Sequence, residues 1–225
     1  MIDDLYRYVP EALFGEYGRV FYSGRDAFNN PSRVYLLGLN PGGSPLDQAQ
    51  ETVSSHSIHV LQDERHNWSA FRDESWLGAR PGSLPMQRRV LHLLDRLELD
   101  AGEVPSSNLV FVRSNREVNL NGRTQELAAA CWEFHRQVIS RLNVEVVVCF
   151  GKTTGDWVRS RLGAHSLVET FVENNARRWT SHSFRNASGL GVVVATHPSI
   201  ADWTTASADP TNLIVDLMRS PVAAG

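Results

Sequence analysis

Four short apolar runs stand out along the chain, at residues 34–37, 109–112, 144–150 and 192–195. Each run is nearly continuous and rich in β-branched or aromatic residues. This pattern is typical of strands that are buried on both faces of a sheet. The runs therefore predict four central strands.

Helical periodicity lies between the runs. Apolar side chains recur every three or four positions over residues 85–99, 124–142 and 153–162, as on one face of an amphipathic helix. Asp209 followed by Pro210 is typical of a helix start and predicts a last helix over residues 210–219. Strands that alternate with helices predict a parallel sheet with helices on both faces. We therefore expect a single α/β domain over residues 1–225, a three-layer sandwich around a four-stranded, mainly parallel sheet.

Two further stretches have other patterns. Residues 178–183 and 191–195 flank a Gly- and Ser-containing turn and predict a hairpin that leads into the last strand. Residues 43–82 are polar, rich in His and Trp, and predict a long functional or mobile loop with a short helix. His56, His59 and His66 lie in this loop without a nearby cysteine, so we expect no metal site there.

Composition limits the partners and the compartment. The formal net charge of −3 gives no global basic field, so a nucleic-acid site must be a local patch. The two cysteines lie in apolar stretches and are typical of core thiols. The first residues are acidic, and no apolar run reaches membrane-spanning length. We expect a cytoplasmic monomer that does not interact with membranes.

Polar side chains follow the predicted strands. Asn40 follows the first run, Asn115 the second, and His197 with Ser199 the fourth. Ligands of open parallel sheets bind beyond the carboxyl ends of the strands, so these groups are expected to meet at one edge. This convergence predicts a site but does not name a reaction.

Simpler interpretations of the same motifs stay open. Asn40, Pro41 and Gly42 form good turn chemistry, and His197 could be a strand-end histidine with satisfied hydrogen bonds. Residues 151–153 resemble the end of a phosphate loop, but Val146 stands where that loop needs glycine. The chain also lacks the Gly-x-Gly-x-x-Gly and Gly-x-Ser-x-Gly motifs.

Taken in order, the strand-end motifs resemble those of the uracil-DNA glycosylase superfamily. The sequence Gly-Leu-Asn-Pro-Gly at 38–42 is similar to the first motif of its mismatch-specific and single-strand-selective branches. Thr-His-Pro-Ser at 196–199 is similar to the last motif. Residues 109–115 and 146–151 resemble the two remaining strands, so the resemblance spans residues 34–215.

The resemblance implies roles for individual residues. Asn40 would position the attacking water, His197 would face the leaving base, and Asn115 would read the pyrimidine edge. Ser199 would approach a DNA phosphate. Other residues follow from their place beside these motifs. The base-binding set is completed by Gly38, Leu39, Pro41 and Gly42. The expected DNA contacts are a wedge from Ile200 or Trp203 and phosphate contacts from Arg113 and Arg116.

The sequence also departs from the family pattern. Ile200 stands where the last motif usually has a second proline, and the stacking aromatic is not fixed, with Trp68, Phe71 and Trp76 as candidates. Two cysteines are too few for an iron–sulfur cluster, so no cofactor is expected. The expected function is a DNA glycosylase of base excision repair that removes uracil or another deaminated base. The alternatives are a non-cleaving binder of modified or single-stranded DNA and a small-nucleotide hydrolase.

Overall fold

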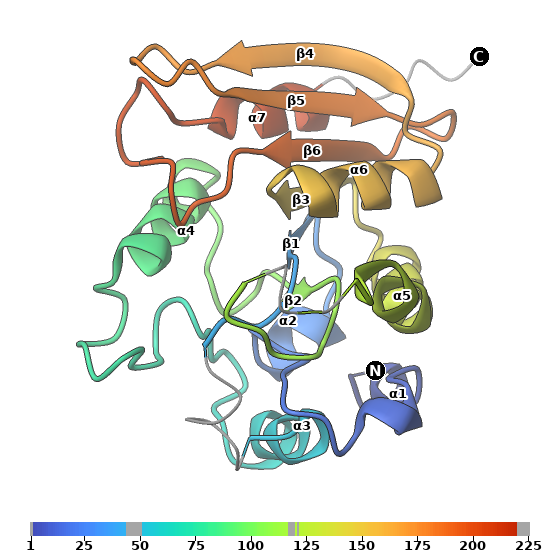
Figure 1. Ribbon diagram of the computed structural model, residues 1–225. Coiled ribbons are helices and arrows are strands. Elements are labelled where there is room, and N and C mark those ends of the chain that lie inside the picture. Colours follow the sequence, from blue (N-terminus) through green and yellow to red (C-terminus); the bar gives the residue numbers. More distant parts are fainter. Residues whose placement is uncertain (1, 44–50, 117–119, 121, 220–225) are drawn as a thin grey trace.

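One six-stranded sheet forms the centre of the computed structural model, which describes residues 2–43, 51–116, 120 and 122–219. The strands lie in the order β2-β1-β3-β6-β5-β4 (Figure 1). Neighbours are parallel from β2 to β6, whereas β5 and β4 are antiparallel to the strands beside them. The α/β class is confirmed, but the expected four-stranded sheet was too small and the sheet is mixed. The bounds are β1 (Val34–Gly38), β2 (Ser106–Asn108), β3 (Val146–Phe150), β4 (Ser166–Val172), β5 (Thr180–Arg185) and β6 (Gly191–Ala195).

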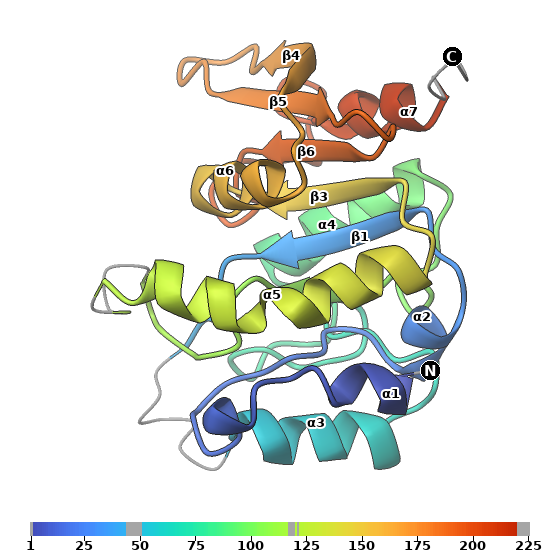
Figure 2. The same ribbon diagram turned by 90° about the vertical axis from the view of Figure 1, so that its right-hand side faces the viewer.

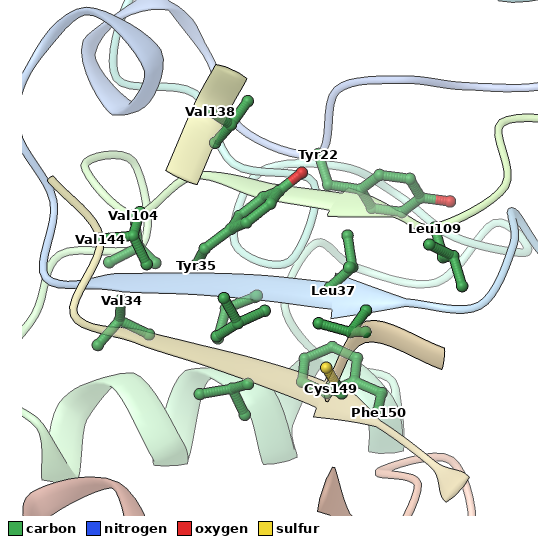
Figure 3. Packing of buried hydrophobic residues seen from close by; sticks show 14 of the residues in the cluster. Tyr22, Val34, Tyr35, Leu37, Val104, Leu109, Val138, Val144, Cys149 and Phe150 are labelled. Atoms are coloured by element: carbon green, nitrogen blue, oxygen red, sulfur yellow. The ribbon is translucent and has the colours of Figure 1, made fainter. Parts of the chain in front are cut away.

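The three strands β1, β3 and β6 are buried along their whole length, as their continuous apolar runs predict. Figure 3 shows Tyr35 and Leu37 on one face of β1, with Val138 above Tyr35. The Tyr35 hydroxyl donates to His135 Nδ1 over 2.7 Å, while His135 Nε2 donates to the backbone oxygen of Leu109. Burial lowers the pKa of His135 to about 3, which keeps this ring neutral in the core.

Helices cover both faces of the sheet. Gly155, in the helix after β3, packs against Val194 of β6, whereas Leu217, in the C-terminal helix, packs against Gly191 of the same strand. Gly191 and Val194 are three residues apart in β6 and therefore point to opposite faces of the sheet. Figure 2 shows α5 running alongside β1, with α1 and α3 at the end of the molecule farthest from β4. No helix in the described part of the chain is long and apolar enough to cross a membrane. The bounds are α1 (Ile2–Tyr6), α2 (Arg25–Asn29), α3 (Val53–Gln62), α4 (Pro85–Arg96), α5 (Thr124–Arg141), α6 (Lys152–Arg161) and α7 (Thr211–Arg219), with a short 3₁₀ helix at Glu11–Leu13.

The second apolar run, residues 109–112, is not the strand that the sequence predicts, because β2 comes just before it. These residues lie between the end of β1 and an N-terminal segment. The Leu109 amide donates to the Gly38 oxygen over 2.8 Å, and the Arg19 amide donates to the Phe111 oxygen over 2.9 Å. The run is apolar because it fills the space between two segments and α5, where Phe111 packs edge-to-face on Phe134.

The antiparallel half of the sheet was only partly predicted. The expected hairpin is present as β5 and β6, which pair in antiparallel register from His182–Val194 to Arg185–Gly191. β4 was missed because nearly all of its residues are exposed, so it has no apolar signature. Its pairing with β5 shifts register between Leu167 and Glu169, as at a β-bulge.

Residues 51–71 pack against the core, whereas residues 72–82 form an irregular, partly exposed stretch. The expected short helix is α3, whose Thr52 side chain accepts from the Ser55 amide over 3.1 Å. Trp68 and Phe71 farther along are buried in the core. Residues 44–50 of the expected loop lie outside the described part of the chain.

Gly18 is required for the close approach of the N-terminal segment to residues 109–112. A Cβ at Gly18 would lie 2.0 Å from the backbone oxygen of Phe111, so the two segments would have to separate. We expect Gly18→Ala to destabilise the protein by about 1–3 kcal/mol in urea-induced unfolding. Gly15→Ala is the control, because a Cβ there meets no atom within 4 Å. Equal stability of both variants would contradict this assignment.

Candidate functional site

The three parallel strands β1, β3 and β6 end at the same edge of the sheet, and predicted site residues follow β1 and β6 there. Asn40 lies two residues after β1 and His197 two residues after β6, with β3 between these strands. Adjacent strands are about 4.8 Å apart, so two such spacings separate the strand ends by roughly 10 Å. Asn40 and His197 therefore border one common edge.

The Asn40 side chain has a defined orientation. Its Nδ2 donates to the backbone oxygens of Pro41 and Ser114 over 2.9 and 3.0 Å. Only the amide nitrogen can donate to two carbonyl oxygens, which fixes the direction of the amide group. Oδ1 is the acceptor of this amide group, the atom that suits a hydrogen bond from a water molecule.

Arg113 holds the loop that follows β1. Its guanidinium donates to the Gly42 oxygen and forms an ion pair with Glu51. The Arg113 side chain is only 3% exposed. This burial does not fit the phosphate contact expected from the sequence, so we assign Arg113 to the support of the loop.

Arg19 extends this support into a buried ionic network. It makes paired hydrogen bonds to the carboxylates of Glu51, at 2.5 and 2.7 Å, and of Glu74, at 2.7 and 2.6 Å. Burial alone would lower the pKa of Arg19, but these hydrogen bonds outweigh it and raise that pKa above its ordinary value. Since Arg113 shares Glu51, the network balances two guanidiniums with two carboxylates.

The contacts of His197 select one tautomer of its neutral ring. Its Nδ1 accepts from the Ser199 amide over 3.1 Å and lies 2.8 Å from the Ser199 hydroxyl. An amide can only donate, so in the neutral ring the proton sits on Nε2. Burial lowers the pKa of His197 to about 4, so the neutral form prevails near neutral pH. Nε2–H is thus a fixed donor at this edge.

Trp203 supports His197 from below instead of contacting a ligand. It is fully buried and packs edge-to-face on Phe150, with ring centroids 5.6 Å apart. Phe150 in turn packs edge-to-face on His197 at 6.3 Å. The burial rules out the DNA wedge expected of Trp203. Ile200 is 53% exposed and is therefore the apolar side chain that remains available there.

The two asparagines near β2 lie in different environments. Asn115 is exposed, seven residues beyond the end of β2, whereas Asn108 is the last residue of β2 and is buried. Asn108 packs closely against the end of β1, because its Oδ1 would lie only 2.2 Å from a Cβ at Gly38. Sequence reasoning missed Asn108 because it placed the strand three residues too late.

The remaining predicted residues are found around the same loops. Pro41 is buried, Leu39 is half-buried, and Gly42, Arg116 and Ser199 are exposed. Of the candidate stacking aromatics, Trp68 and Phe71 are buried in the core and do not fit that role. Trp76 is half-buried, and its indole donates to Glu74. Within the described ranges, no group of three or more His, Cys, Asp or Glu side chains could hold a metal ion.

Comparison with known proteins gives no relative from which a function could be transferred. No family model matches the chain, and neither does any curated protein. A functional interpretation therefore depends on the strand-end geometry and its chemistry.

The ionic network yields a stability prediction. Arg19→Met leaves two carboxylates with one guanidinium in a buried site, and we expect a loss of about 3–5 kcal/mol in the free energy of unfolding. Arg33→Met is the matched control, because Arg33 also pairs with a carboxylate, that of Glu145, but is 53% exposed. Its loss should be no more than about 1 kcal/mol. Equal losses in urea-induced unfolding would show that burial of the Arg19 network is not important.

The tautomer and pKa of His197 can be measured by nitrogen-15 NMR of the imidazole rings. We expect His197 to keep its proton on Nε2 and to stay neutral between about pH 8 and about pH 5. The unfolded chain takes up this proton near its ordinary pKa of about 6.5. Burial of the neutral ring therefore makes folding less favourable as the pH falls from about 6.5 to about 4.

His59 provides an internal reference in the same spectra. His59 donates a hydrogen bond to the Asp63 carboxylate, and this bond, with further help from Glu64, raises the pKa of His59 above its ordinary value. The two rings should therefore titrate on opposite sides of the ordinary histidine pKa. A His197 signal that titrates together with that of His59 would contradict the buried, neutral assignment.

Proposed function

We propose that this protein is a DNA glycosylase of the uracil-DNA glycosylase superfamily, and that it excises uracil or another deaminated base from DNA. The observation that carries the proposal is the pairing at one sheet edge of an oriented Asn40 with a neutral His197 whose Nε2 bears the proton. Asn40 is suited to accept a hydrogen bond from a water molecule, and His197 is suited to donate one to a carbonyl oxygen.

The chemistry of base excision matches these two groups. Breaking the bond between the base and C1′ of the deoxyribose develops positive charge on the sugar and negative charge on the base. Nε2–H of His197 would donate to the base carbonyl where negative charge grows, and a donor held in place beforehand is effective in such a role. Water then adds to C1′ and loses a proton, while the departing base gains one.

Asn40 would orient the water through Oδ1. An amide is not a strong base near neutral pH, so this arrangement favours a dissociative step in which the sugar cation forms before water attacks. The hydrogen bonds from Nδ2 to two backbone oxygens preorganise Oδ1 for this task. The arrangement supports slower chemistry than a carboxylate would give.

The target base must leave the duplex stack to reach this edge. An asparagine side chain offers one donor and one acceptor, which complements a uracil carbonyl and its neighbouring N–H. Asn115 is exposed in the stretch that follows β2 and is the side chain we assign to this task, whereas Asn108 at the end of β2 is buried against Gly38. Ile200 is exposed just after the His197 motif, where it would fill the vacated stack.

Single-turnover excision on a uracil-containing oligonucleotide tests the roles of Asn40 and His197. Loss of one preorganised donor typically costs about 100- to 1,000-fold in rate, so we expect His197→Ala to slow excision by roughly that factor. Asn40→Ala should slow excision similarly, whereas Asn40→Asp should retain or raise the rate because a carboxylate polarises water better. Thermal melts of each variant control for folding, and affinity for the oligonucleotide should change little.

The outcome also separates the other two functions. If the wild type excises the base and both alanine variants are equally fast, the assigned roles are wrong. Binding of a uracil, hypoxanthine or xanthine strand without an abasic product would instead establish a non-cleaving binder of modified or single-stranded DNA. Activity on free nucleosides alone would establish a small-nucleotide hydrolase.

A further inference from the structure

A groove of about 430 Å³ lies on the far side of His197 from β1, between α6 and the strands β5 and β6. His197 and Ile200, which belong to the proposed site, are among its lining residues. Two aromatic side chains, Trp179 and Phe184, and the imidazole of His182 also line it, together with Lys152 from the start of α6. The groove is therefore continuous with the site but is not used by the proposed chemistry.

The aromatic side chains of the groove are paired with arginines. The Arg177 guanidinium lies 4.4 Å from the ring centroid of Trp179, and that of Arg159 lies 4.7 Å from the centroid of Phe184. Trp179 and Phe184 are only partly buried, so part of each ring stays open to a ligand. Flat rings beside cations are the combination that single-stranded nucleic acids use for base stacking and phosphate contacts.

Positive charge gathers in this part of an acidic chain. Residues 151–185 carry six Lys or Arg and three Asp or Glu, although the whole chain has a net charge of −3. One of the three acids, Glu173, is fully buried, and Asp156 lines the groove, where it pairs with Lys152 and Arg159. The groove thus has one acid beside three cations, namely Lys152 in its lining and Arg159 and Arg177 over the two rings.

One contact connects the groove to the segment after His197. Arg177 donates from Nη1 to the backbone oxygen of Ile200 over 2.7 Å while it stacks on Trp179. Ile200 therefore projects from a segment that the groove wall holds. A strand that passes the exposed Ile200 side chain reaches Trp179 next.

We propose that this groove binds a single-stranded DNA segment that flanks the target nucleotide, with one base stacked on Trp179 and phosphates against the cations around Lys152 and Arg159. The inference rests on the proposed function for its choice of DNA. It goes further by assigning a subsite on β5 and α6, away from the reacting groups, that prefers single strands because a duplex keeps its base faces covered.

Binding of undamaged DNA tests the groove separately from catalysis. The probe is a fluorescein-labelled oligothymidylate, and the readout is fluorescence anisotropy. Stacking on one aromatic ring is worth about 5- to 150-fold in affinity, so Trp179→Ala should weaken binding by roughly this factor. Trp179→Phe keeps a stacking surface and should recover much of the affinity. Arg159→Gln should weaken binding and reduce the salt dependence by about the 0.7 logarithmic units expected for one phosphate contact.

Two matched controls lie outside the groove lining. Tyr8 also carries a guanidinium over its ring, that of Arg141 at 5.3 Å, but it lies beside α5. Tyr8→Ala and Arg141→Gln should leave the affinity for oligothymidylate unchanged. Thermal melts establish that each variant is folded, and Arg159→Gln keeps the test valid if Trp179→Ala does not fold.

These results test DNA binding by the groove independently of base excision. Equal binding by wild type, Trp179→Ala and Arg159→Gln would overturn the groove, even if the wild type excises uracil normally. Duplex binding as tight as single-strand binding, with the same losses in the variants, would also overturn it. Loss of single-strand binding in these variants would support the groove, even if no deaminated base is ever excised.

Discussion

Two guanidiniums and two carboxylates share a largely buried site behind the loop that follows β1, and the candidate site depends on this balance. Arg19 holds Glu51 and Glu74, and Arg113 holds Glu51 and the backbone of Gly42. Charges are costly to bury, so such a network persists only when each member is paired. The pairing connects the N-terminal segment to the Asn40 loop. Core residues far from the edge therefore position a polar side chain at it.

The other half of the site depends on apolar burial. Trp203 and Phe150 form a column of rings beneath His197, and the resulting desolvation keeps the imidazole neutral. Ser199 then selects the tautomer with two contacts to Nδ1. Two different interactions thus determine the structure of one sheet edge. Ionic pairing fixes the loop after β1, and desolvation fixes the protonation state of His197 after β6. Each is built from residues that never need to touch a ligand.

The sequence predicted the parallel strands that are apolar and buried along their whole length. β1, β3 and β6 are continuous apolar strands, so their positions and the edge that carries Asn40 and His197 could be predicted. β4 could not, because an exposed strand has no apolar pattern. Burial of individual polar or aromatic side chains is equally hidden, which is why Arg113 and Trp203 were expected at the surface. Whether such a side chain is buried depends on segments that are distant in the sequence, so the local residue pattern does not predict it.

The exposed strand β4 has a further consequence for how the molecule behaves in a crowded solution. As the last strand of the sheet, it presents backbone groups that a strand from a second molecule could pair with, and Leu167 and Val168 would add apolar contact. The register shift between Leu167 and Glu169 interrupts this template, since a bulge bends the edge and breaks the regular spacing of its hydrogen-bonding groups. The irregular edge thus protects the protein against strand-to-strand aggregation.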